Sequence, residues 1–135
     1  MTNNAKWRVA RLEDLERRGR FIPVREALGI HSFGINAIKQ GDDGTLINEH
    51  DESGGQEEVY VVLSGEADFE IEGESVHAGP ETALRVGATT HRKILPGPEG
   101  VKILVLGGVP GEVYSPPAFT ELGGPDPTVD PARIA

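Results

Sequence analysis

Short apolar segments separated by glycine and proline turns are the feature that most constrains the fold of this 135-residue chain. Glycine supplies positive φ and proline a fixed φ where a chain must reverse direction, so each turn marks the end of a strand. Many short strands at close, even spacing predict an all-β sandwich or barrel. The predicted strands cover residues 21–24, 33–39, 45–50, 57–63, 67–72, 75–77, 83–86, 91–95 and 101–106.

The two ends of the chain differ from this pattern. Residues 8–18 have a weakly helical periodicity and many charges, which predicts a short solvated N-terminal helix. Six of the ten prolines lie between Pro110 and Pro131, which predicts an extended Pro-rich C-terminal tail over 109–135 with mobile last residues. Tyr114 and Phe119 are expected to hold part of this tail against the rest of the protein. The length favours a single domain over 1–135, with a core at about 21–108.

The composition argues against several classes of protein. The net charge of −9 would repel phosphate backbones and anionic membranes, so we expect neither nucleic acid nor membrane as a partner. The N-terminus lacks a secretory signal and no segment approaches the roughly twenty apolar residues of a membrane span, so a cytoplasmic location is expected. Without cysteine, a metal would have to be held by imidazole, carboxylate, amide or water.

The segment from Asn48 to Gly65, NEHDESGGQEEVYVVLSG, combines a histidine, five carboxylates and an apolar strand around a turn. Side chains repeat on one face of a strand every second residue, so Asn48 and His50 are expected to share a face, as are Glu58 and Tyr60. One imidazole and one carboxylate would therefore converge across two paired strands. The sequence predicts a metal-binding hairpin here.

These residues also carry a family resemblance. Glu58 followed after six residues by Gly65, with His50 upstream, resembles the first motif of the cupin superfamily, H-x-H, a short spacer, E, six residues, G. The segment VGATTHRKIL occupies the place of the second cupin motif, with His91 as its histidine. The resemblance covers roughly residues 21–108 and implies a double-stranded β-helix, or jelly-roll, barrel.

The resemblance further implies a metal held by His50, Glu58 and His91, with Asn48 or Glu52 as a fourth ligand. The donor set favours a divalent transition metal, Fe, Mn, Ni or Zn, with open positions for substrate or dioxygen. Other interpretations are an ion pair from Glu58 to Arg85 or Arg92 and a solvent-facing His91. The residues expected to line the substrate pocket are Tyr60, Arg85, Phe33 and Ile35.

Two classes of function remain open at this point, and the sequence identifies no catalytic residue. One is a metal-dependent enzyme of dioxygenase, decarboxylase or isomerase type that acts on a small oxygen-rich molecule. The other is a metal-free cupin that binds a small ligand or a protein without catalysis. In either case the segments 59–63 and 103–106 are apolar on both faces, which predicts a second covering layer or a homodimer.

Overall fold

The protein is an antiparallel β-barrel with very little helix. The computed structural model describes residues 2–3, 6–52, 54–117, 126–128 and 134–135. Within these residues no helix is long and apolar enough to cross a membrane. The elements are β1 (Thr2–Asn3), β2 (Arg8–Val9), the 3-10 turn η1 (Leu12–Asp14), β3 (Phe21–Ile22), α1 (Val24–Leu28), β4 (Gly34–Lys39), β5 (Ile47–His50), β6 (Glu57–Ile71), β7 (Glu74–Ala78), β8 (Ala83–Val86) and β9 (Arg92–Gly108).

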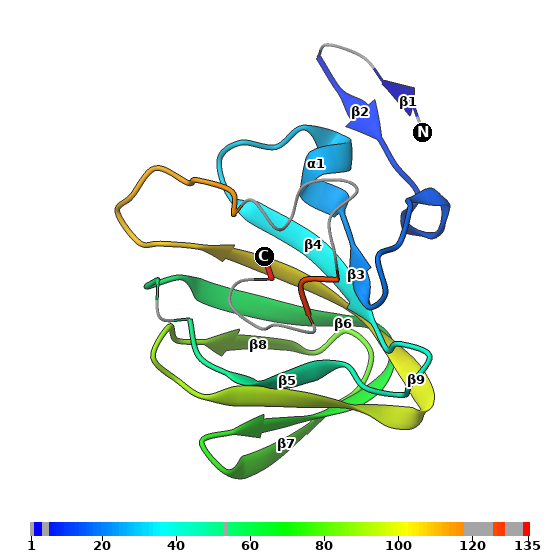
Figure 1. The fold of residues 1–135 in the computed structure, drawn as a ribbon, viewed down its shortest axis with the longest axis vertical. Coiled ribbons are helices and arrows are strands. Elements are labelled where there is room, and N and C mark those ends of the chain that lie inside the picture. The colour runs from blue at the N-terminus through cyan, green and yellow to red at the C-terminus, as the bar shows by residue number, and fades with distance from the viewer. Residues whose placement is uncertain (1, 4–5, 53, 118–125, 129–133) are drawn as a thin grey trace.

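Two long strands, β6 and β9, organise the barrel (Figure 1). Each joins two of the shorter predicted strands, and the two pair with each other from Glu57–Gly108 to Ile71–Arg92. The first half of β6 also pairs with β8 and its second half with β7, while β9 pairs with β4 near its end and with β5 near its start. Both long strands therefore run through the two facing halves of the barrel, and the predicted all-β class is confirmed.

β6 and β9 bend where Gly65 meets Gly100. The register of the pair shifts between Val62 and Ser64 and again between Gly65 and Ala67. Gly65 has φ +74°, and a Cβ at this position would lie 2.9 Å from the Cα of Val101 and closer still to the Gly100 carbonyl oxygen. Because L side chains rarely adopt this backbone conformation and no space exists for one, only glycine fits.

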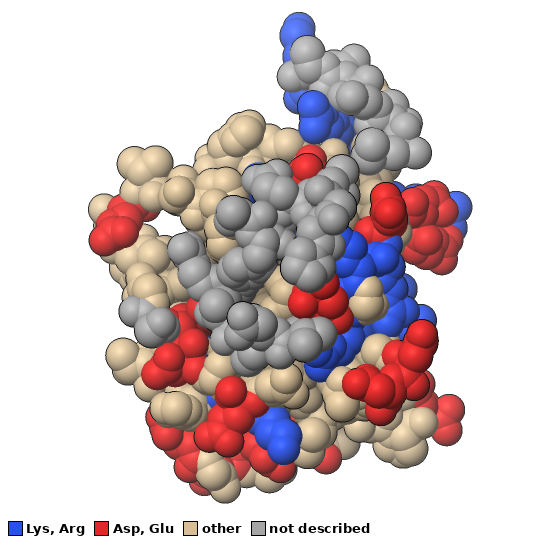
Figure 2. Space-filling model, in the orientation of Figure 1, with Lys and Arg blue, Asp and Glu red and all other residues tan. Residues whose placement is uncertain are grey.

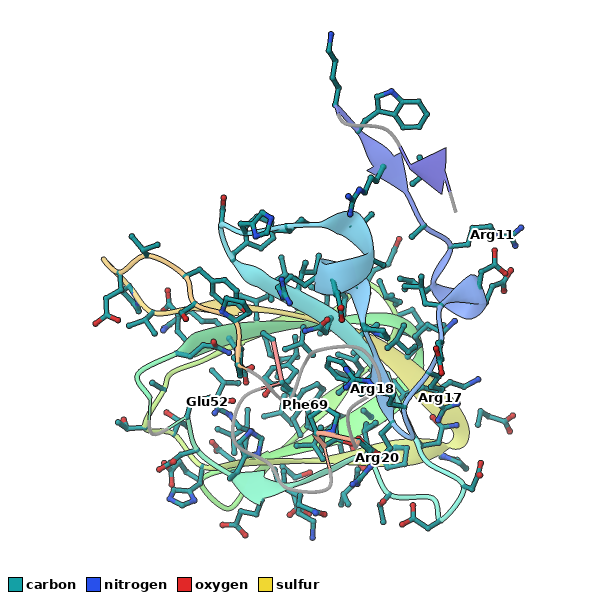
Figure 3. The ribbon with its side chains drawn as sticks, turned by 45° about the horizontal axis from the view of Figure 1, so that its top comes forward. Arg11, Arg17, Arg18, Arg20, Glu52 and Phe69 are labelled. Carbon is teal, nitrogen blue, oxygen red and sulfur yellow. The ribbon has the colours of Figure 1, made fainter. Side chains whose placement is uncertain are left out.

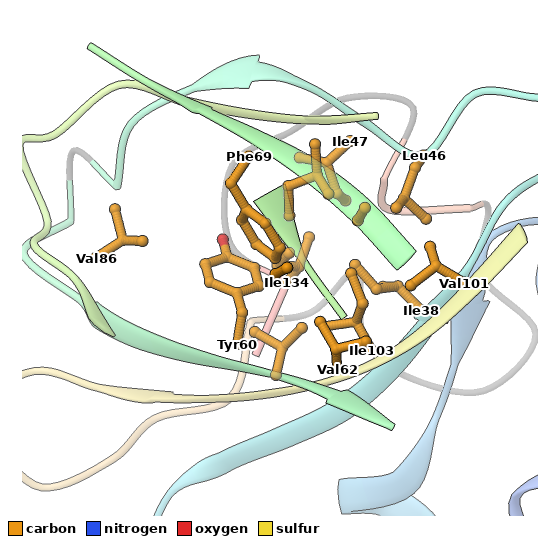
Figure 4. Packing of buried hydrophobic residues seen from close by; sticks show 14 of the residues in the cluster. Ile38, Leu46, Ile47, Tyr60, Val62, Phe69, Val86, Val101, Ile103 and Ile134 are labelled. Carbon is orange, nitrogen blue, oxygen red and sulfur yellow. The ribbon is translucent and has the colours of Figure 1, made fainter. Parts of the chain in front are cut away.

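Much of the barrel interior is filled by apolar side chains (Figure 4). Alternate residues of β6 and β9 point inward, and the ring of Tyr60 meets the edge of Phe69 at a centroid distance of 5.5 Å. A second, smaller cluster lies outside the barrel, where residues 12–28 cover the outer face of β4 and β9. The main interior cluster comprises Ile38, Leu46, Ile47, Tyr60, Val62, Ala67, Phe69, Ala78, Val86, Ile94, Val101, Ile103, Val105, Ile134 and Ala135.

The N-terminal segment differs from its prediction. In place of a helix over 8–18, the structure has the two-residue strand β2 and the single turn η1. The α-helix that does form, α1, lies at 24–28, where the end of a strand was expected, and Gly29 ends it in the left-handed conformation. The half-buried Leu12 and Leu15 pack on the outer cluster, so contact with the barrel determines the path of this segment more than local helical propensity does.

Positive charge gathers on one side of the molecule, where the N-terminal arginines lie (Figures 2 and 3). These arginines have structural partners. Arg17 donates to the carbonyl oxygens of Gly19 and Gln40, Arg18 lies over the ring of Phe21 at 4.7 Å, and Arg20 bonds Thr45 at 2.9 Å. The basic segment therefore anchors the chain to the barrel, and these three arginines bind groups of the protein itself.

The described end of the tail is buried in the barrel. Ile134 and Ala135 are fully buried, although we expected mobile last residues. The Asn36 side-chain amide donates to the Ile134 carbonyl at 3.2 Å, and the Tyr114 hydroxyl donates to the Ala135 carbonyl at 3.2 Å. Tyr114 thus holds the tail as predicted, whereas Phe119 lies outside the described residues. The missed signal is the apolar pair at the end of an otherwise polar, Pro-rich segment.

Ile134→Ala should test whether this contact matters for stability. We expect the free energy of unfolding to fall by about 2 kcal/mol, since the substitution removes buried methyl groups at a site near a chain end that can partly close. Urea denaturation followed by circular dichroism would measure it. Val113→Ala is the matched control, because Val113 is 96% exposed and its loss should change little. Equal stability of the two variants would contradict the buried position of Ile134.

Candidate metal centre

A bulge in β5 turns His50 into the barrel. β5 pairs with β9 through Ile47–Ile94 and His50–Arg92, with a register shift between the two pairs. As a result Ile47 and His50 are both buried, although their spacing would place them on opposite faces of a regular strand. Asn48 is exposed, so the predicted shared face of Asn48 and His50 is not formed and the Asn48 side chain points away from the candidate site.

The imidazole of His50 is oriented by the backbone. Its Nδ1 lies 3.0 Å from the carbonyl oxygen of Asn48. A carbonyl can only accept, so Nδ1 carries the proton and Nε2 presents a lone pair. Burial lowers the pKa of His50, partly offset by the hydrogen bond to Asn48, so the neutral ring is favoured.

The lone pair of His50 faces the carboxylate of Glu52. The distance from Nε2 to Glu52 Oε1 is 3.4 Å, and both side chains are almost completely buried. The backbone fixes Glu52 in place, since its amide donates to the Ala88 carbonyl at 2.7 Å and its carbonyl accepts from Gly55. Figure 3 shows Glu52 separated from the arginines Arg18 and Arg20. A cation held between these two electron-rich atoms would relieve their repulsion.

Glu58 supplies the third group of the site. It precedes Tyr60 by two residues on β6, so both side chains point inward. The Tyr60 hydroxyl donates to Glu58 Oε1 at 2.6 Å, and the Gln56 amide donates to Oε2 at 3.2 Å. Burial, and then the charge of Glu52, raise the pKa of Glu58 to about 7. Burial and the neighbouring Glu58 charge likewise raise the pKa of Tyr60 well above its usual value.

His50, Glu52 and Glu58 together match the donor set of a divalent metal. One ligand atom from each lies within 4.8 Å of the others, and all three residues are buried. Neutral imidazole and carboxylate oxygens suit iron, manganese, nickel or zinc, and a cation would relieve both the facing lone pairs and the crowded carboxylates. The side chains present therefore fit such an ion, and of the two alternatives for a further ligand the structure brings Glu52 into the group.

The structure does not bring His91 to this group. His91 is about half exposed, and its ring nitrogens lie 3.7 Å from Glu49 and from Asp51 on the outside of the barrel. The cause is strand alternation: Arg92 and Ile94 point inward, so His91 points outward. This placement agrees with the alternative of a solvent-facing His91.

Arg92 takes the inward position next to His91. Its side chain is completely buried and Nη2 donates to the Gly87 carbonyl at 2.7 Å. Nη1 lies 4.0 Å from Glu58 Oε1, so of the two ion pairs considered for Glu58 the Arg92 pair is present at long range. Within the described part of the chain, Nε and Nη1 of Arg92 form no hydrogen bond.

The residues predicted to line a substrate pocket lie in different places. Tyr60 is inside the barrel and holds Glu58. Phe33 and Arg85 line a groove on the outer surface, together with Val59 of β6. Ile35 packs in the outer apolar cluster, as the core interpretation of this residue implied. Of the four, Tyr60 has a side chain that bonds a member of the candidate metal group, whereas Phe33 and Arg85 share with Glu58 the lining of the outer groove.

Sequence reasoning missed Gln56, and it considered Arg92 as an ion-pair partner of Glu58 without placing it on the inward face of its strand. Gln56 precedes Glu58 by two residues, so strand alternation alone places both side chains on one face. Arg92 alternates with the apolar Ile94 while His91 alternates with Lys93, so the inward face of this strand could have been identified from its apolar member.

Comparisons with known proteins support the fold. No family model and no curated protein matches the sequence. Among solved structures, a cupin protein from Bacteroides fragilis superposes with a TM-score of 0.65 at 16% identity, covering 84% of this chain and 93% of its own. A cupin-superfamily sugar phosphate isomerase from Silicibacter pomeroyi gives 0.62 at 15% identity, covering 81% and 77%. A predicted oxalate decarboxylase from Thermotoga maritima gives 0.61 at 16%, covering 76% and 99%. The fold expected from the two sequence motifs is therefore confirmed, and this chain has the fold of the cupin superfamily.

Proposed function

We propose that the protein binds a divalent transition metal through His50, Glu52 and Glu58 and acts on a small oxygen-rich molecule inside the barrel. The observation that carries the proposal is the buried lone pair of His50 Nε2, 3.4 Å from a Glu52 carboxylate oxygen. A bound ion would supply Lewis acidity and coordination positions for oxygen atoms of a ligand. The three side chains need not move far when the ion binds, because the fold already holds their ligand atoms within 4.8 Å of one another.

The residues around the three ligands support their orientation. The Asn48 carbonyl fixes the His50 ring with its Nε2 lone pair toward Glu52. The Tyr60 hydroxyl and the Gln56 amide hold the two oxygens of Glu58. Partners of this kind set the direction and basicity of metal ligands, and their loss typically weakens metal binding. Tyr60 and Gln56 are therefore positioning residues in this proposal.

The fold accommodates several types of reaction. Two of the superposed structures are a sugar phosphate isomerase and a predicted oxalate decarboxylase, and at their level of identity they indicate the fold alone. We take isomerisation and decarboxylation, together with dioxygenase chemistry, as the first activities to screen on small hydroxy and carboxylate compounds. Homodimer formation also stays a prediction, and the 40%-exposed Leu63 and the half-buried Val59 on the outer face of β6 are consistent with it.

A metal-free ligand-binding cupin is the second candidate, and Arg92 favours it. Its guanidinium lies 4.0 Å from Glu58, so it contributes a positive charge where the family resemblance implied a histidine ligand. In this alternative Arg92 balances the carboxylates without an ion, and the barrel binds a ligand without catalysis. The presence or absence of bound metal separates the two candidates.

Metal content by inductively coupled plasma mass spectrometry, with calorimetric titration of Mn²⁺, Fe²⁺, Ni²⁺ and Zn²⁺ into chelator-treated protein, would test the proposal. We expect about one ion per chain. Removing a ligand in His50→Ala, Glu52→Gln or Glu58→Gln should weaken binding by more than the roughly 10–100-fold typical of a lost supporting residue. His91→Ala and Glu57→Gln are matched controls, because both side chains point outward.

Two outcomes would contradict this expectation. Protein that stays metal-free after reconstitution would favour the second candidate. Binding that is lost in His91→Ala and retained in His50→Ala would place the ion outside the barrel, near Glu49 and Asp51.

A further inference from the structure

We infer that Arg92 binds the carboxylate group of a ligand inside the barrel, beside His50, Glu52 and Glu58. The inference deepens the proposed function by naming a substrate class, and it relies on that proposal for where the ligand sits. It rests on the geometry and the charge of Arg92.

The first argument is the unmet hydrogen-bonding capacity of Arg92. A guanidinium has five N–H donors and cannot lose its charge in a protein. Arg92 is completely buried, yet within the described residues its guanidinium donates a single hydrogen bond, from Nη2 to the Gly87 carbonyl. Its Nε and Nη1 have no acceptor there, and leaving such donors buried and unpaired is costly. An arriving acceptor would recover that cost.

The second argument is that Glu58 does not serve as this acceptor. Glu58 Oε1 already accepts from the Tyr60 hydroxyl at 2.6 Å and Oε2 from the Gln56 amide at 3.2 Å. Arg92 Nη1 stays 4.0 Å from Oε1, beyond hydrogen-bonding distance. Tyr60 and Gln56 therefore hold Glu58 away from Arg92, and the guanidinium keeps donors for another group.

The third argument is the charge balance of the interior. If Glu52 and Glu58 are ionised around a divalent ion, their two negative charges balance the two positive charges of the ion. The buried guanidinium of Arg92 then remains as one unbalanced positive charge. A ligand with a single negative charge would neutralise it. The planar guanidinium matches the two oxygens of a carboxylate, which favours an anion over a neutral polyol. Phosphate fits the same fork but carries more than one negative charge near pH 7, so the charge balance favours a monocarboxylate.

The position of Arg92 suits this role. It pairs with His50 across β5 and β9 and with Ile71 across β6 and β9, so three strands fix its backbone. A ligand whose carboxylate rests on Arg92 would have the rest of its atoms close to the metal group. Arg92 would then be a specificity-determining residue that selects anionic ligands.

Calorimetric titration of acetate into the Mn²⁺-loaded protein tests the inference, with acetamide as a neutral probe of similar shape and with phosphate as a second anion. We expect acetate to bind at least about tenfold more tightly than acetamide, because a charge-assisted bond to a buried guanidinium is lost with the neutral probe. Arg92→Gln should weaken acetate binding by about tenfold or more, and Arg92→Lys, which keeps the charge, by severalfold. Lys93→Gln is the matched control, since it removes a positive charge from the adjacent, outward-facing residue.

A second readout separates ligand binding from a structural role. By thermodynamic linkage, saturating acetate should tighten Mn²⁺ binding by the same factor by which Mn²⁺ tightens acetate binding, and this coupling should shrink in both Arg92 variants. Circular dichroism and thermal unfolding confirm that the variants fold, and Arg92→Lys carries the test if Arg92→Gln does not fold.

The outcomes distinguish this inference from the metal proposal. Metal binding without acetate binding, or acetate binding that Arg92→Lys and Arg92→Gln leave unchanged, would overturn the inference while the metal site stands. Equal binding of acetamide and acetate would overturn it as well. If no metal binds, acetate titrated into metal-free protein decides: Arg92-dependent binding supports the carboxylate site alone, and no binding overturns it.

Discussion

Glu58→Gln should make the metal-free protein more stable than the wild type at pH 8. Burial and the Glu52 charge raise the pKa of Glu58 from 4.5 to about 7, so the folded protein favours the protonated acid. A raised pKa contributes stability that is fully present below pH 4.5 and lost as the pH rises through about 7. Glutamine is permanently neutral, so the variant does not lose this stability as the pH rises. For a pKa raised from 4.5 to about 7, the loss in the wild type is about 3 kcal/mol of unfolding free energy above pH 7.

The measurement is urea denaturation of chelator-treated proteins at pH 4.5, 6 and 8. The stability gain of Glu58→Gln over the wild type should be largest at pH 8 and should vanish near pH 4.5. Glu57→Gln, the exposed neighbour on β6, should show no such dependence. A variant that is less stable than wild type at pH 8 would mean that the carboxylate is stabilised where it lies.

The same substitution is expected to remove a metal ligand, so stability and function should change in opposite directions. Added Mn²⁺ should raise the stability of the wild type and have much less effect on Glu58→Gln, since only protein with a complete site gains stability from the ion. Such opposition is typical of sites in which like charges are held together in a buried place.

Gly65→Ala should strongly destabilise the barrel. A Cβ at Gly65 would overlap the backbone of Gly100 and Val101, and φ is +74°. The left-handed conformation costs an L residue about 1–2 kcal/mol, and separating two backbones adds about 1–3 kcal/mol more. We therefore expect a loss of about 4 kcal/mol in the free energy of unfolding, measured by urea denaturation.

Gly73→Ala is the matched control for this prediction. Gly73 has a similar φ of +79°, but a Cβ there meets no atom within 4 Å. It should cost only the conformational part, about 1–2 kcal/mol. Equal losses in the two variants would show that backbone conformation alone, and not the contact between β6 and β9, makes Gly65 necessary.

Much of the barrel was predictable because its signals are local. Glycine turns and alternating apolar residues identified the strands from Phe21 onward, and the spacing of Glu58 and Gly65 identified the motif. The N-terminal segment was not predictable in this way, since Leu12 and Leu15 follow contacts with distant strands. The burial of Ile134 depends in the same way on partners far away in the sequence.

The site was predicted in part for a related reason. His50 and Glu58 were identified from the motif, and the structure brings them together with Glu52. The bulge in β5, which sets the direction of His50 and Asn48, depends on pairing with β9 and has no local signal. A local signal did exist for the directions of His91 and Arg92: Ile94 is apolar and shares a strand face with Arg92, which indicates that this face points inward and His91 outward.

The nested pairing of β6 with β9 has a consequence for how the protein folds. The pair Ile71–Arg92 closes the shortest loop and Glu57–Gly108 the longest, so loop entropy favours pairing that starts at the inner end and proceeds outward. His50 joins β9 at the inner end, opposite Arg92, whereas Glu58 pairs with Gly107 near the outer end. The three carboxylate and imidazole groups therefore meet only when the last part of the ladder has closed, which delays the mutual repulsion of Glu52 and Glu58 until the rest of the barrel can hold them in place.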